Sequence, residues 1–308
     1  MTRTALEAAS ALYQAGPGVR FTRLALGASQ RLWPALAVRA ACRLFLTPLP
    51  PKWLHRRRAW DPSWRVEAWP FEEAGLTVYS RPNAPHGPVA LLVHGWGGHA
   101  GQLLALAEAV AAQGLRPVIL EMPGHGRSPG SQSTLPQFAR AIEYTAARLR
   151  QQGFTLRALV AHSLGASAAA FVASRGLPVQ RLVLIAPPAS PPAYTRFFAQ
   201  VFGLSERTRA RMQQRIEARE GMPMPQFEPP AVAPRIRVPT LVVHDRQDRI
   251  NRFVDGQAWA QAIEGAQLDA TDGLGHRKLL ADEGVVRRVI AFVADPGNEE
   301  PLSRATVG

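Results

Sequence analysis

The stretch around residue 163 constrains the fold of this chain more than any other. Residues 157–160 form a short apolar run typical of a buried strand, and residues 166–171 form an alanine-rich run that favours a helix. Between them stands A-H-S-L-G, with Ser163 at its centre. Small residues are needed there because a tight turn from strand to helix leaves little room for side chains. The pattern predicts a sharp turn that raises the Ser163 hydroxyl clear of a sheet.

Taken alone, Ser163 has two interpretations. A serine that follows a strand often caps the N-terminus of the next helix. A serine on such a turn can also be a nucleophile, since the backbone N–H of Leu164 would lie at the helix N-terminus, where developing negative charge is stabilised. The five-residue pattern does not decide between them, and the rest of the chain has to be considered.

Segments of strand character and helix character alternate along the sequence. The predicted strands are residues 65–71, 76–80, 89–93, 117–121, 157–160, 182–185, 240–244 and 267–270, and the main predicted helices are residues 100–113, 135–151, 252–263 and 278–293. Such alternation predicts an α/β fold with a mostly parallel, doubly wound sheet, preceded here by a hairpin of the first two strands. Functional side chains are then expected beyond the carboxyl ends of the strands.

Composition and charge exclude several classes of protein. Apolar residues make up 46% of the 308 residues, so the chain can bury a large core, and its single cysteine, Cys42, excludes an intramolecular disulfide. The net charge of +13 is uneven: residues 1–66 carry eleven basic and two acidic side chains, or +9, which leaves +4 for the remainder. No nucleic-acid-binding module and no zinc spacing accompanies these arginines. The sequence therefore predicts no nucleic-acid partner, no metal and no cofactor.

The basic segment, residues 1–60, is predicted to be a helical arm in front of the main domain. Within it Val38, Ala41, Cys42 and Phe45 would share one helical face. We expect this face to pack on the chain's own domain, and the alternative is peripheral contact with an anionic membrane. Arginines interrupt the apolar stretches, so neither a membrane span nor a signal peptide is predicted, and a cytoplasmic location is favoured.

The main domain is expected over residues 61–294, with a flexible polar tail over residues 295–308. The sequence does not predict the oligomeric state.

Two glycine-rich turns follow predicted strands of this domain. The first reads H-G-W-G-G, and its glycines would let the backbone approach the turn that carries the serine. The N–H groups of Trp96 and Leu164 would then form a two-donor oxyanion hole, although the same pattern also suits a merely flexible turn. The second turn, E-M-P-G-H-G-R-S, is expected to shape its own loop, with His125 structural.

A serine nucleophile needs a base to accept its proton and an acid to orient that base. Two later loops, H-D-R-Q-D-R-I and G-L-G-H-R, supply both. Asp248 lies far enough beyond its strand to reach a histidine, whereas Asp245 at the strand end is expected to hold the turn. His276 follows the last strand. The expected roles are Ser163 as nucleophile, His276 as general acid and base, and Asp248 as the orienting carboxylate.

In this order the five motifs resemble the α/β-hydrolase superfamily over roughly residues 66–294. The resemblance implies an esterase-like serine hydrolase, with the triad and oxyanion donors already named. Two positions depart from the family pattern: Ala161 replaces the first glycine of G-x-S-x-G, and Glu121 stands where an aspartate is usual. A serine at the elbow excludes the dehalogenases and epoxide hydrolases of this fold, which use an aspartate there.

An insertion at about residues 187–235 lies where this fold carries its cap. Its aromatic residues predict an apolar substrate pocket formed by Phe197, Phe198 and Phe202 together with His162. The alternative is that they only pack the cap on the core. The expected partner is a small, hydrophobic acyl substrate, and the expected reaction is hydrolysis of a carboxylic ester through an acyl-enzyme. An acyltransferase or thioesterase with the same triad, and a non-catalytic ligand-binding protein of this fold, are the alternatives.

Overall fold

In a computed structural model of the chain, the described residues are 17–56, 59–73, 75–81 and 87–295. The predicted tail therefore lies almost wholly outside the described residues, as do the first sixteen residues of the predicted arm.

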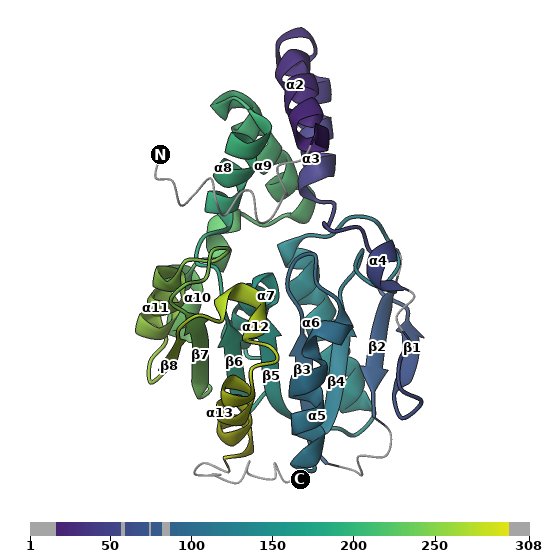
Figure 1. The fold of residues 1–308 in the computed structure, drawn as a ribbon, viewed down its shortest axis with the longest axis vertical. Helices are drawn as coiled ribbons and strands as arrows, with labels where there is room; N and C mark the ends of the chain where they lie inside the picture. Colours follow the sequence, from purple (N-terminus) through teal and green to yellow (C-terminus); the bar gives the residue numbers. More distant parts are fainter. Residues whose placement is uncertain (1–16, 57–58, 74, 82–86, 296–308) are drawn as a thin grey trace, which may run out of the picture.

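A twisted eight-stranded sheet forms the centre of the molecule, with strand order β1-β2-β4-β3-β5-β6-β7-β8 (Figure 1). The strands are β1 (Arg65–Trp69), β2 (Leu76–Ser80), β3 (Val89–Val93), β4 (Arg116–Glu121), β5 (Leu156–His162), β6 (Arg181–Ile185), β7 (Thr240–Asp245) and β8 (Gln267–Thr271). β2 pairs antiparallel with β1 and with β4, and all other pairs are parallel. The predicted α/β class with a mostly parallel sheet is confirmed.

Helices cover both faces of the sheet, as a doubly wound fold requires. They are η1 (Ala100–Leu103), α5 (Leu104–Ala112), α6 (Leu135–Gln151), α7 (Leu164–Ser174), α11 (Phe253–Ala262), α12 (Gly275–Lys278) and α13 (Glu283–Ala294). One core cluster contains Phe138 of α6 and Trp259 of α11, and the other contains Leu106 of α5 and Val289 of α13.

The predicted closing helix over residues 278–293 begins later than expected: α13 starts at Glu283, and residues 279–282 join it to the short helix α12, which ends at Lys278. Leu279 and Leu280 turn into the core between them and are fully or almost fully buried. Asp282 then starts a new helix, because its side chain accepts a hydrogen bond from Val285 N over 2.9 Å. The chain therefore buries these two leucines and starts a new helix at Asp282 instead of continuing one helix from residue 278.

The insertion after β6 forms the helical cap. It consists of α8 (Pro191–Phe202), α9 (Glu206–Glu220), η2 (Met224–Phe227), α10 (Pro229–Val232) and η3 (Ala233–Arg235). Ahead of the sheet, the arm consists of α2 (Pro17–Leu32), α3 (Pro34–Phe45) and α4 (Trp53–Arg56). Figure 1 shows that α2 and α3 stand beside α8 and α9 at the end of the molecule remote from the sheet.

The arm packs on the cap through the helical face expected from the sequence. Val38, Ala41 and Cys42 are buried in a cluster with Phe198 and Phe202 of α8. Polar contacts add to this packing, since the Gln30 side-chain amide donates to Gly203 O over 3.1 Å and its oxygen accepts from Ser205 N over 2.6 Å. This face of α3 is therefore occupied by the chain itself. Within the described residues, no helix is both long enough and apolar enough to cross a bilayer.

Candidate active site

Ser163 occupies a strained turn between strand and helix. β5 ends at His162 and α7 begins at Leu164, so a single residue joins them. Its backbone angles, φ 55° and ψ −126°, are ones that non-glycine residues seldom adopt. The turn is held by hydrogen bonds of 2.8 Å from Ser163 N to Ile185 O and from Ala166 N to Ser163 O. Contacts with the neighbouring strand and with the first turn of the helix thus hold Ser163 in this strained conformation.

The Ser163 hydroxyl does not cap the helix that follows it, although the residue holds the N-cap position. Instead its Oγ lies 3.1 Å from Nε2 of His276. On the other side of the imidazole ring, Nδ1 of His276 lies 2.7 Å from Oδ2 of Asp248. The structure thus brings the three predicted side chains together in the order hydroxyl, imidazole, carboxylate. His276 lies in the short helix α12, not in the open loop that we expected.

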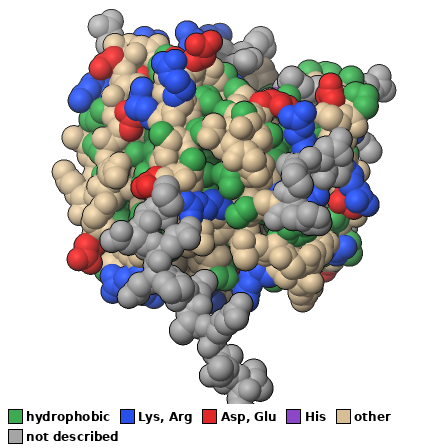
Figure 2. Space-filling model, turned by 90° about the horizontal axis from the view of Figure 1, so that it is seen from below, with side chains coloured by type: hydrophobic (Ala, Val, Ile, Leu, Met, Phe, Trp, Pro, Cys, Tyr) green, Lys and Arg blue, Asp and Glu red, His purple; other side chains and the backbone are tan. Residues whose placement is uncertain are grey.

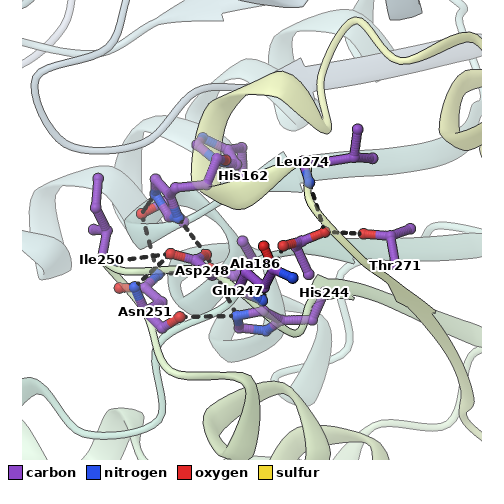
Figure 3. A network of polar contacts seen from close by, with 12 residues as sticks. His162, Ala186, His244, Gln247, Asp248, Ile250, Asn251, Thr271 and Leu274 are labelled. Carbon is purple, nitrogen blue, oxygen red and sulfur yellow. Dashed lines mark hydrogen bonds and ion pairs between the residues drawn. The ribbon is translucent and has the colours of Figure 1, made fainter. Parts of the chain in front are cut away.

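Asp248 is buried and strongly hydrogen-bonded (Figure 3). Its Oδ1 accepts from the backbone N–H groups of Ile250 over 2.7 Å and Asn251 over 3.0 Å. Burial alone would raise the pKa of Asp248, but hydrogen bonds from His244 and His276 and the charge of His276 outweigh it and hold that pKa well below its usual range. The carboxylate is therefore ionised at neutral pH and can orient the imidazole.

Asp245 has the structural role expected of it. Its Oδ2 accepts from Thr271 Oγ1 over 2.8 Å and from Leu274 N over 3.0 Å, while Oδ1 accepts from Gln247 N over 3.0 Å (Figure 3). These contacts tie the loop that carries Asp248 to the segment that leads into α12.

The H-G-W-G-G turn lies directly against the turn that carries Ser163. A Cβ atom added to Gly95 would stand 2.6 Å from Cβ of Ser163, and one added to Gly165 would stand 2.5 Å from His94 O. Both separations are far below contact distance, so the two backbones meet only because glycine occupies these positions. The N–H groups of Trp96 and Leu164 make no hydrogen bond within the described part of the chain. Both donors are thus available for a ligand oxygen.

Two buried histidines fix this turn to the next one. His94 Nε2 accepts from Met122 N over 3.1 Å, and His125 Nε2 accepts from Gly97 N over 3.0 Å. Each ring donates from Nδ1 to a nearby backbone carbonyl. Burial lowers the pKa of His94 to about 4 and that of His125 well below its usual range. His125 is thus a neutral structural group, as expected.

Glu121, which replaces the usual aspartate, serves the same two turns. Its carboxylate accepts from Ala100 N over 2.9 Å, from the Tyr79 hydroxyl over 2.8 Å and from Arg127 N over 2.6 Å. Burial raises the pKa of Glu121, although these hydrogen bonds oppose the shift. The longer side chain therefore fits as an internal acceptor for the loops.

Comparisons with known proteins agree with this architecture. Residues 84–227 match the protein family described as serine aminopeptidase, S33. Est1E from Butyrivibrio proteoclasticus, solved with ferulic acid bound, superposes with a TM-score of 0.60 at 18% identity, over 74% of this chain and 96% of that chain. The esterase Pf2001 from Pyrococcus furiosus gives a TM-score of 0.61 at 16% identity, over 80% and 96% of the two chains. The chain has the α/β-hydrolase fold.

A bacterial membrane phospholipase A matches a larger share of this chain. The TM-score is 0.57 at 17% identity, and the match covers 88% of this chain and 94% of that chain. A comparison with curated proteins found no significant match. At these identities the likeness establishes the fold, and the resemblance expected from the sequence is confirmed at that level.

A large cavity opens beside Ser163, with about 1230 Å³ of empty space that includes its opening to solvent. The walls come from the cap, the arm and the H-G-W-G-G turn. They include Phe45, Leu46, Trp96, His162, Pro191, Tyr194, Phe197, Ile216, Met222, Met224 and Phe227. Nε2 of His162 also lies 2.9 Å from the backbone oxygen of His276. Burial holds the pKa of His162 well below its usual range. The neutral ring thus supports the backbone of the catalytic candidate His276.

Two of the predicted pocket residues lie elsewhere. Phe198 and Phe202 are buried between the cap and the arm, where Phe198 meets Phe45 edge to face with ring centroids 5.2 Å apart. Helix α8 has two apolar sides, one toward the cavity and one toward the arm, and these residues occupy the second. For Phe198 and Phe202 the alternative of packing alone is correct, and the pocket assignment is wrong.

Sequence reasoning missed two residues at the reactive centre, Asn251 and His244. The Asn251 side-chain amide donates to Ala186 O over 2.6 Å and to Ser163 Oγ over 3.4 Å, and its Oδ1 accepts from the hydroxyl of Tyr194 in the cap. His244 Nε2 lies 3.1 Å from Asn251 O and 3.5 Å from Asp248 Oδ2. The available signal was their proximity to Asp248 in H-D-R-Q-D-R-I-N.

Proposed function

We propose that this α/β-hydrolase cleaves a carboxylic ester through an acyl-enzyme formed on Ser163. The observation that carries the proposal is the unbroken hydrogen-bonded path from Asp248 through His276 to Ser163. The orientation suits general-base catalysis, because Nδ1–H of the imidazole faces the carboxylate and Nε2 faces the hydroxyl.

In the first half of the reaction, Ser163 Oγ attacks the acyl carbon while His276 Nε2 takes the hydroxyl proton. The carbonyl oxygen of the ester becomes an oxyanion, which the N–H groups of Trp96 and Leu164 would stabilise. The bond to the alcohol then breaks, and His276 returns the proton to the leaving oxygen. In the second half, His276 takes a proton from water, the resulting hydroxide displaces Ser163 from the acyl group, and the proton passes back to Ser163.

The cavity favours a hydrophobic substrate. Most of the side chains that face it are aliphatic, aromatic or proline, so an alkyl or aryl group would be transferred from water to an apolar site. The esterase and phospholipase among the structural relatives are consistent with this class.

The same cavity argues against an aminopeptidase, the activity in the name of the matched family. Binding the ammonium group of a peptide N-terminus calls for a free carboxylate. Glu220 is the acidic residue in the described cavity wall, and Arg140 lies 3.0 Å from one of its oxygens and Arg219 lies 3.7 Å from the other. That carboxylate is already neutralised by the protein.

Labelling with a fluorophosphonate, followed by hydrolysis assays, tests the proposal. Wild-type protein should be labelled and should hydrolyse p-nitrophenyl esters, and Ser163→Ala should do neither while keeping the same thermal unfolding midpoint. A folded wild type that is not labelled would indicate a ligand-binding protein instead. Labelling without ester turnover, but with turnover of an acyl thioester or transfer to an added alcohol, would identify a thioesterase or an acyltransferase.

A further inference from the structure

The outer surface of the arm is unusually apolar. Nine large hydrophobic side chains are exposed in the described residues, and seven of them belong to the arm. Five lie on α2, on α3 or at the turn between them, and we call these five the arm patch. They are Phe21 and Leu24, each 74% exposed, Leu32 at 64%, Trp33 at 62% and Leu36 at 55%. Isolated exposed apolar residues are ordinary, but a concentration on one short hairpin marks an interaction surface.

The patch is organised by helix periodicity. Phe21, Leu24, Ala28 and Leu32 follow one another at spacings of three, four and four residues, which places them in one stripe along α2. The other side of α2 is used for packing, since Leu26 is buried in the cluster that joins arm and cap. The stripe is therefore a second apolar face, separate from the one that holds the arm in place.

The arm around this stripe is entirely basic. Residues 17–45, which contain α2 and α3, carry five basic side chains and no acidic one; the five are Arg20, Arg23, Arg31, Arg39 and Arg43. The opposite end of the molecule, seen in Figure 2, mixes acidic and basic side chains over its described surface. The hairpin that carries the apolar stripe thus bears only positive side-chain charge.

Part of this charge borders a hollow between arm and cap. Arg39 and Arg43 of α3 line it from one side, and Arg215 and Arg219 of α9 line it from the other. Within the described residues, Arg39, Arg43 and Arg215 have no carboxylate partner, whereas Arg219 pairs with Glu220 over 3.7 Å and donates to Gln132 Oε1 over 3.4 Å. Unpaired arginines on two facing helices are suited to bind the oxygens of phosphate groups.

We propose that the α2–α3 hairpin docks this protein on an anionic lipid bilayer. The arm patch inserts among the acyl chains at the interface, where tryptophan is favoured, and the arginines beside it contact lipid phosphates. Charge selects this occupant over a second copy of the chain, because pairing two arms would bring together basic groups with no acidic group between them. Phe45, at the end of α3, lines the cavity beside Ser163, so docking through this hairpin brings the membrane to the helix that forms a cavity wall.

Flotation of the full chain with phosphatidylcholine vesicles, with and without phosphatidylglycerol, tests the proposal. Wild type should float with the anionic vesicles, less so at high salt, and weakly with the neutral ones. The double variants Leu24→Ser/Leu32→Ser and Arg39→Glu/Arg43→Glu should each lower the partition coefficient at least about tenfold. These side chains are exposed, and unchanged thermal unfolding would show that the variants are folded.

Matched controls are Val254→Ser, which removes an exposed apolar group from α11, and Arg287→Glu, which reverses an exposed charge on α13. Neither should change the partition. The proposal is overturned if wild type fails to float with anionic vesicles at low salt, or if the controls lose as much binding as the arm variants. It is overturned equally if light scattering shows a dimer that Leu24→Ser/Leu32→Ser dissociates, without any binding to vesicles. Because the readout is binding, the result does not depend on the proposed ester hydrolysis.

Discussion

The side-chain amide of Asn251 lies 3.4 Å from Oγ of Ser163, on the same hydroxyl that faces His276. Tyr194 of the cap donates to the other end of this amide. A single asparagine thus contacts the cap, the end of β6 and Ser163.

Replacing Asn251 with alanine should impair both folding and catalysis. The buried carbonyl of Ala186 loses its 2.6 Å donor, which should lower the free energy of unfolding by about 1–3 kcal/mol. The Ser163 hydroxyl loses one of its two partners, so kcat should fall about tenfold. Urea denaturation and steady-state ester hydrolysis measure the two effects. Tyr194→Phe is the control for the cap contact alone and should lose less of both.

The two aspartates of the loop after β7 should differ sharply in their effects. Asp248→Asn removes the charge that orients the His276 imidazole and should lower kcat by about three to four orders of magnitude. Asp245→Asn leaves His276 untouched and should act mainly on stability, since this side chain accepts from Gln247, Thr271 and Leu274. Equal losses of kcat in two variants of equal stability would mean that the orienting carboxylate is misassigned.

Gly95→Ala should reduce turnover in a folded protein. The new methyl group would stand 2.6 Å from Cβ of Ser163, so the H-G-W-G-G turn has to move away from the nucleophile. We expect kcat/KM to fall by about a hundredfold, the scale of losing one oxyanion donor. Gly27→Ala in α2 is the matched control, because a Cβ there meets no atom within 4 Å. Full activity of Gly95→Ala would show that the turn does not contribute to the reaction.

Acid should destabilise the protein before the carboxylates titrate. His94 is neutral when folded, with a pKa of about 4, whereas an unfolded histidine binds a proton near pH 6.5. The unfolded state therefore binds more protons between these values, and stability falls as the pH falls through that window, by at most about 3 kcal/mol from His94. His125 and His162 shift in the same direction. Unfolding free energies measured from pH 7 to pH 4 should show a weaker dependence in His94→Gln.

The catalytic candidates could be found from the sequence because their signals are local. The elbow at Ser163 combines a strand, small residues and a helix within a few positions, and the loops with Asp248 and His276 each follow a recognisable strand. Since carboxyl ends of parallel strands meet at one edge of a sheet, order along the chain was enough to bring these loops together.

The sequence could not predict contacts between segments that are far apart along the chain. The hydrophobic pattern of α8 identifies Phe198 and Phe202 as buried, but a helix with two apolar sides does not reveal which side faces the arm. Asn251 reaches Ser163 only because Ala186, at the end of another strand, holds its amide in place. Hydrophobic periodicity along the chain does not show which of these distant segments come into contact.

The arm contacts the main domain as well as the cap. Ser133 N donates to Leu46 O over 2.9 Å, Lys52 donates to Ser128 O over 2.9 Å, and a Cβ added to Gly97 would overlap the backbone of Leu49. Residues 46–52 thus pack against the H-G-W-G-G turn and the loops beside the cavity. A shortened gene that started at β1 would encode Ser163, Asp248 and His276, yet it would yield a protein with an open flank and an unsupported H-G-W-G-G turn.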